Sequence, residues 1–196
     1  MALLVLSVRP PWLDQLVDRA LIVEDALVPA DAIILTVDAI PNAGVDALRL
    51  LQAGIASHVA VFGETLDPAD DQKREGGWIP DRGIEQRLRE LAEIGLTDVT
   101  VIHPFVSGTR EEAKALAVWC RSHNIHRVIV FTVPDHSRRV RRVLRRVLRD
   151  QTEIRVRPAH GSAAHPIFGD GAHLDLPTII RELAKLGVDV VMHPLG

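Results

Sequence analysis

Residues 128–148 of the chain read VIVFTVPDHSRRVRRVLRRVL, and this stretch decides the fold. Its first four residues are apolar, mostly β-branched and without polar alternation, which is typical of a strand in a parallel sheet covered on both faces. The segment TVPD then supplies turn and helix-capping residues. Apolar residues next recur at helical spacing, at positions 140, 143, 144, 147 and 148. The stretch therefore predicts a buried strand that leads directly into an amphipathic helix, with His136 and Arg139 on its first turn.

The same alternation of strand and helix extends outward along the chain. Strands are predicted at 32–37, 58–62, 99–102, 128–131 and 153–156, and helices at 10–21, 45–53, 84–94, 109–123, 137–149 and 176–186, the last ended by Gly187. Residues 64–83 and 159–175 are predicted loops. This pattern predicts an α/β fold, a Rossmann-like doubly wound and mainly parallel five-stranded sheet in three layers. We expect one domain over residues 29–196, with an N-terminal segment, residues 1–28, docked on it.

A Rossmann-like strand order of 3-2-1-4-5 would place a switch point between the first and fourth strands. Ligands of open α/β sheets bind at such a point, because helix N-termini with free N–H groups and positive dipole ends converge there. Residues 36–42 and 132–139 would line this crevice.

The composition bounds the class of protein. A chain of 196 residues with 47% hydrophobic and 25% charged residues suits one globular domain with a sizeable core. The single cysteine, Cys120, excludes an internal disulfide and a cysteine-rich metal site, and its helical spacing with neighbouring apolar residues predicts a packed core thiol. The sequence contains no glycine-rich dinucleotide motif, no Walker loop and no GxSxG elbow.

The N-terminal run MALLVLSV is apolar but short. Crossing a bilayer takes about 20 such residues, and Arg9 and Pro10 end the run. It also lacks the basic region and the small-residue cleavage site of a signal peptide. We expect a soluble, cytoplasmic protein without a membrane span, or a membrane-associated protein if this segment is a shortened anchor.

The helix predicted at 137–149 is rich in arginine, at positions 138, 139, 141, 142, 145, 146 and 149. Basic clusters bind nucleic acid or anionic lipid in many proteins. Here no aromatic residue interleaves to stack bases, and the whole chain carries a net charge of −3. We therefore expect a solvated face that pairs with the more acidic first half of the chain, and no nucleic-acid partner.

Two short motifs face the predicted crevice. Thr109 and Glu112 have the spacing of a capping box, in which each side chain would bond the other residue's backbone N–H. His136 and Arg139 share one helix face, where Arg139 can hold an anion bidentately. The helix dipole and the nearby arginines should favour neutral His136, able to act as a donor or base.

A second histidine-rich segment follows the fifth strand, with His160, His165 and His173 beside Asp170 and Asp175. The spacings match no metal signature, so no metal site is predicted.

Four segments together resemble the YdcF-like group, which includes SanA and ElyC and is known as domain of unknown function 218. They are the segment PADAIIL from Pro29 to Leu35, the segment TREEA that starts at Thr109, the segment VFT at 130–132 followed by HSRR at 136–139, and the segment ELAK from Glu182 to Lys185. The resemblance covers the chain from about Pro29 to its end.

The resemblance implies a Rossmann-like fold with a site at the switch point. It implies S-adenosylmethionine as a candidate ligand and a link to bacterial envelope biogenesis. Two departures stand out, because the family's glycine-rich turn after the first strand is here Thr36-Val37-Asp38-Ala39-Ile40, and the family's Asn is Glu112. Both changes add carboxylate character, which disfavours phosphate and favours a cationic or differently shaped ligand.

Three hypotheses follow. In the first, the crevice binds a small nucleotide-like ligand through Thr36, Asp38, Thr109, Glu112, Thr132, His136 and Arg139. In the second, the site is vestigial and the arginine-rich helix binds a protein partner. In the third, the protein is a hydrolase or transferase with His136 as catalytic general base, oriented by Asp38 or Glu112.

Overall fold

The computed structural model describes residues 11–64, 83–106, 108–159 and 176–192. The strands are β1 (Ala32–Leu35), β2 (His58–Glu64), β3 (Val99–Val106), β4 (Arg127–Thr132) and β5 (Glu153–Pro158). The helices are α1 (Pro11–Leu21), α2 (Ile40–Gln52), α4 (Ile84–Glu93), α5 (Thr109–Ser122), α6 (Ser137–Leu148) and α7 (Leu176–Met192), with short 3-10 turns η1 (Pro134–His136) and η2 (Arg149–Gln151).

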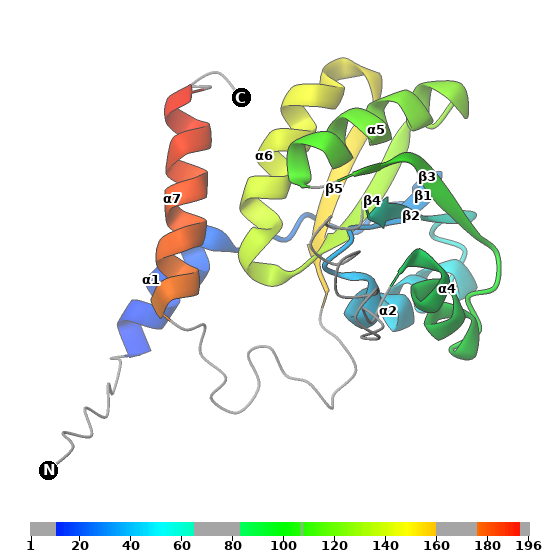
Figure 1. The fold of residues 1–196 in the computed structure, drawn as a ribbon, viewed down its shortest axis with the longest axis horizontal. Coiled ribbons are helices and arrows are strands. Elements are labelled where there is room, and N and C mark those ends of the chain that lie inside the picture. Colours follow the sequence, from blue (N-terminus) through cyan, green and yellow to red (C-terminus); the bar gives the residue numbers. More distant parts are fainter. Residues whose placement is uncertain (1–10, 65–82, 107, 160–175, 193–196) are drawn as a thin grey trace, which may run out of the picture.

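The five strands form one parallel sheet in the order β3-β2-β1-β4-β5 (Figure 1). This confirms the predicted Rossmann-like, doubly wound α/β fold and its strand order. Residues of β1 alternate between the two faces, and their register with β4 pairs Ile33 with Ile129 and Ile34 with Val130. Because both faces are covered, all four residues of β1 are buried, which explains the unbroken apolar run in the sequence.

Two hydrophobic clusters lie on opposite faces of the sheet. One packs apolar residues of α5 and α6 against Ile34, Phe62 and Val130. The other packs α2 and α4 against Ile33, Val61 and Ile129. The apolar stripe predicted for the arginine-rich helix faces the first cluster, with Val140, Val143, Leu144 and Leu148 buried and Val147 partly buried. The predicted core thiol, Cys120, is buried in that cluster as well.

Helices α1 and α7 lie outside this three-layer body, side by side next to α6 (Figure 1). Residues after α1 join the first part of the chain to α6 and β5: the Val23 N–H donates to the Ser137 hydroxyl at 2.8 Å, and Asp25 bonds the Val156 backbone through its own N–H and its carboxylate. Within the described ranges, no helix combines the length and the apolar character needed to cross a membrane. Residues 1–10 lie outside the described residues.

Some predicted boundaries were wrong. Helix α2 begins at Ile40 and not at residue 45, because Pro41 stands in the first turn, where its missing N–H costs nothing. Helix α7 was predicted to end at Gly187 but continues to Met192. A glycine inside a helix is tolerated where other contacts hold the next turn, and here Asp189 forms ion pairs with Arg142 and Arg146 of α6.

Candidate functional site

A cavity of about 390 Å³ lies at the carboxyl edge of β1 and β4, at the predicted switch point. Its walls are Val37, Asp38, Val106, Gly108, Thr109, Glu112, His136, Arg139 and Lys185. We call it the switch-point pocket. It brings together five of the seven predicted site residues, from three separate connections of the sheet.

Thr36 and Thr132 are not among the described residues that line this pocket. Thr36 is buried at the end of β1, and its hydroxyl lies 2.5 Å from Asp38 Oδ1 and 3.1 Å from the Phe131 carbonyl oxygen. It therefore orients Asp38. Thr132 is fully buried at the end of β4, and its hydroxyl has no hydrogen-bond partner among the residues that the structure describes.

Three carboxylates surround the ring of His136. Its Nδ1 is 2.7 Å from Asp38 Oδ2, and its Nε2 is 3.3 Å from Glu182 Oε1 and 3.5 Å from Asp135 Oδ2. Burial disfavours the charged ring, but the hydrogen bond to Asp38 and the surrounding negative charges outweigh it and raise the pKa of His136. Both ring nitrogens can donate only when the ring is protonated. The pKa shift of His136 is therefore toward the charged form, opposite to the expected preference for the neutral ring, because the three carboxylates are closer than the helix dipole and the arginines suggest.

Glu182 and Lys185 were not predicted as site residues, although the segment ELAK formed part of the family resemblance. Glu182 is 1% exposed, and its carboxylate accepts hydrogen bonds from Arg139 Nε at 3.2 Å and from Lys185 Nζ at 2.7 Å. Burial opposes its ionisation, but the hydrogen bond from Lys185 and the neighbouring positive charges lower the pKa of Glu182. The site thus includes a fourth element, α7, which sequence spacing alone does not bring to the switch point.

The predicted capping box does not form. Glycine at 108, with φ of +134°, precedes α5, and its carbonyl oxygen accepts from the Glu112 N–H at 3.0 Å. The Thr109 hydroxyl instead accepts from Arg139 at 2.6 Å, and Glu112 Oε1 accepts from the Val37 N–H at 3.2 Å. Both side chains turn away from their own helix end because partners just after β1 and on α6 lie within reach.

The two carboxylates of the pocket have opposite protonation preferences. Burial and then the charge of Asp38 raise the pKa of Glu112 to about 7. Burial opposes ionisation of Asp38 too, but the hydrogen bonds with His136 and Thr36 outweigh it and lower the pKa of Asp38. Two carboxyl groups whose pKa values are pushed apart are the usual arrangement for an acid and a base.

The arginines of α6 contact other parts of the chain. Arg141 and Arg145 approach Asp25 at 2.7 and 3.6 Å, Arg142 and Arg146 approach Asp189, and Arg138 donates to backbone carbonyl oxygens of Arg19 and Ile22. The arginines were expected to pair with the more acidic first half of the chain. Their carboxylate partners come from both halves, Asp25 from the first and Asp189 from the second. A partner surface on this helix stays a prediction, and charge reversal there would also break internal ion pairs.

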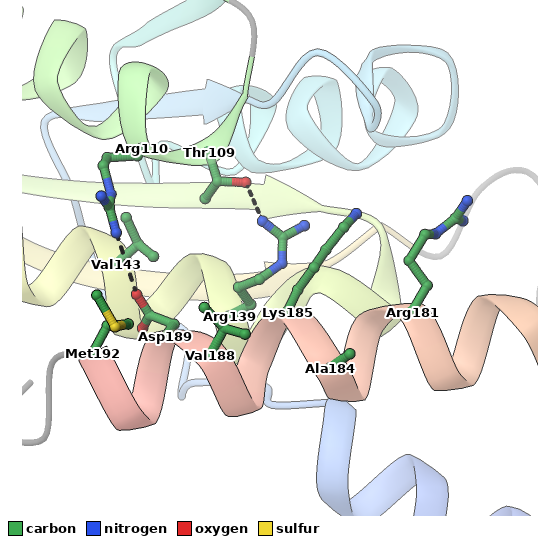
Figure 2. Close-up of a pocket in the computed structure, with 10 residues that line it drawn as sticks. All are labelled: Thr109, Arg110, Arg139, Val143, Arg181, Ala184, Lys185, Val188, Asp189 and Met192. Carbon is green, nitrogen blue, oxygen red and sulfur yellow. Dashed lines mark hydrogen bonds and ion pairs between the residues drawn. The ribbon is translucent and has the colours of Figure 1, made fainter.

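A second cavity of about 690 Å³ adjoins the first, between the start of α5, α6 and α7 (Figure 2). Its walls are Thr109, Arg110, Arg139, Val143, Arg181, Ala184, Lys185, Val188, Asp189 and Met192. We call it the helix-side cavity. Three of these residues, Thr109, Arg139 and Lys185, line the switch-point pocket as well.

Among the described residues, no group of three or more His, Cys, Asp and Glu side chains is arranged to hold a metal ion. The segment with His160, His165 and His173 lies outside the described residues.

No family model and no curated protein matches this chain. Among solved structures, the universal stress protein from Archaeoglobus fulgidus in complex with dAMP aligns with 64% of this chain and 96% of that protein, at 10% identity and a TM-score of 0.39. The aureusimine biosynthetic cluster reductase domain aligns with 76% of this chain and 56% of its own length, at 11% identity and a TM-score of 0.34. With TM-scores this low, the fold assignment rests on the strand order, and membership of the YdcF-like group stays a proposal.

Proposed function

We propose that this chain binds a small nucleotide-like ligand in the switch-point pocket. The observation that carries the proposal is the convergence of the β1–α2 turn, the N-terminus of α5 and the start of α6 on one cavity lined by cationic and carboxylate side chains. Its volume of about 390 Å³ lies in the usual range for small-molecule sites, where a few convergent polar groups fix the ligand's orientation.

The lining side chains favour a ligand that carries both signs of charge. Arg139 and Lys185 suit an anionic group, and the ionised Asp38 suits a ribose hydroxyl or a cationic centre. S-adenosylmethionine combines a carboxylate, a ribose and a sulfonium, so it is the first compound to test. The resemblance to the YdcF-like group supports the same choice, and a role in bacterial envelope biogenesis rests on that resemblance alone.

The test is a thermal-shift and calorimetry screen with S-adenosylmethionine, S-adenosylhomocysteine, nucleotides and sugar phosphates. Ligand at about 100 times its Kd stabilises the folded state by about 2.7 kcal/mol, which raises the Tm of a domain of this size by roughly 5–10 °C. Arg139→Ala should abolish the shift. Arg145→Ala is the matched control, because Arg145 lies on the same helix and pairs with a carboxylate outside the pocket. A screen without any shift, or a shift that Arg139→Ala leaves intact, would refute the proposal.

A hydrolase or transferase activity on the bound ligand is the second candidate. The opposite pKa shifts of Asp38 and Glu112 favour it, with Glu112 as proton donor and Asp38 as base or nucleophile. His136 is less suited to the role of base, because the carboxylates around it favour its protonated form. Glu112→Gln should then stop product formation, while the Kd of the ligand changes little. Chromatography of the ligand identified in the screen measures product formation.

A further inference from the structure

The helix-side cavity differs from the switch-point pocket in the kind of side chain that lines it. Val143, Ala184, Val188 and Met192 form an apolar floor (Figure 2). Val188 is 63% exposed and Met192 66% exposed, so this floor is open to an incoming molecule. Apolar surface gathered inside a concave site usually marks a binding surface, because leaving it in water is unfavourable.

The two cavities form neighbouring compartments of one site. Thr109, Arg139 and Lys185 belong to the walls of both, and Arg139 donates to the Thr109 hydroxyl at 2.6 Å across the boundary. In Figure 2 the Arg139 side chain points toward Thr109, and the Lys185 side chain extends from α7 beside it. A ligand whose charged group lies at these cations can therefore extend into the apolar cavity without leaving the protein surface.

The rim of the helix-side cavity is mainly cationic. Arg110 and Arg181 join Arg139 and Lys185 around it. Among the described residues of the wall, Asp189 is the one carboxylate, and it contacts arginines of α5 and α6. An apolar floor with a cationic rim is complementary to a molecule with an apolar chain and an anionic group.

We propose that the ligand of this chain is a monomeric amphiphile, whose anionic group lies at Arg139 and Lys185 and whose apolar chain occupies the helix-side cavity against Val188 and Met192. The proposal deepens the proposed function and rests on it for the position of the charged group. It adds an apolar acyl or alkyl chain to the anionic, nucleotide-like head group of that proposal.

The experiment measures the Kd of butyl, hexyl and octyl phosphate by calorimetry, each below its micelle concentration, with inorganic phosphate as the chain-free reference. Burying a methylene is worth up to about fourfold in affinity, so the Kd should fall steadily with chain length. Val188→Asp places a carboxylate on the apolar floor and should bring octyl phosphate back to the affinity of butyl phosphate. Val191→Asp is the matched control, since Val191 is 77% exposed on the same helix and does not line the cavity.

Arg139→Ala separates the two proposals. Chain-dependent binding that Val188→Asp removes and Arg139→Ala weakens supports the amphiphile. A Kd that does not change with chain length overturns it, and the nucleotide-like ligand then stands or falls by its own screen. Chain-dependent binding that Arg139→Ala leaves unchanged also overturns it, because the head group would not lie at the switch point. Binding to anionic vesicles without binding of monomeric octyl phosphate overturns it in favour of a membrane surface.

Discussion

Replacing Glu112 by Gln should change how the stability of the protein depends on pH. Glu112 is 7% exposed, and burial together with the charge of Asp38 raises its pKa from 4.5 to about 7. Between these two values the folded chain holds a proton that the unfolded chain has released. The free energy of unfolding therefore falls as pH rises through this interval and levels off above pH 7. Across the whole interval, the raised pKa of Glu112 lowers the free energy of unfolding of the wild type by about 3 kcal/mol.

Glutamine keeps the shape and the carbonyl oxygen that accepts from the Val37 N–H, but it cannot ionise. The variant should match the wild type near pH 4 and exceed it by up to about 3 kcal/mol at pH 8. Urea unfolding followed by circular dichroism at pH 4, 5, 6, 7 and 8 measures the difference. Glu111→Gln controls for removing a negative charge from the same first helical turn, because Glu111 is exposed. Parallel stability curves for Glu112→Gln and wild type would refute the reasoning, since the pKa of Glu112 would then be the same in the folded and unfolded chain.

Four further outcomes are expected. Asp38→Asn should bring the pKa of His136 down toward its usual range in an NMR titration, and an unchanged titration would contradict the pairing of these two side chains. Because the pKa of His136 is raised in the folded state, wild-type His136 stabilises the fold at low pH. This contribution is lost as pH rises through the folded pKa. Asp189→Asn should cost about 2 kcal/mol and speed hydrogen exchange in α7, because it leaves the arginines of α6 without their carboxylate. Gly44→Ala should lower the Tm, because the added Cβ would lie 2.7 Å from Ile94 Cδ1, whereas Gly187→Ala, inside α7 with open space around it, should raise stability by up to about 1 kcal/mol.

The layered fold could be predicted because it depends on local burial. Unbroken apolar runs such as that of β1 mark strands covered on both faces, and the 3.6-residue stripe of α6 marks the face that packs on them. The strand order also followed, since right-handed crossovers between parallel strands leave few arrangements. The position of the pocket came with that order, because the carboxyl ends of β1 and β4 meet there.

By itself the sequence determined the sheet, its covering helices and the edge at which polar side chains meet, because each depends on periodicity within a short segment. Only the tertiary structure decided which partner each polar side chain takes. His136 and Asp38 are 98 residues apart in the chain, and Glu182 comes from a helix that local spacing does not connect to the sheet. The raised pKa values of His136 and Glu112 and the failure of the capping box all follow from such distant neighbours. Charge, unlike apolar burial, is set by individual contacts within a few ångströms, and these exist only once the chain is folded.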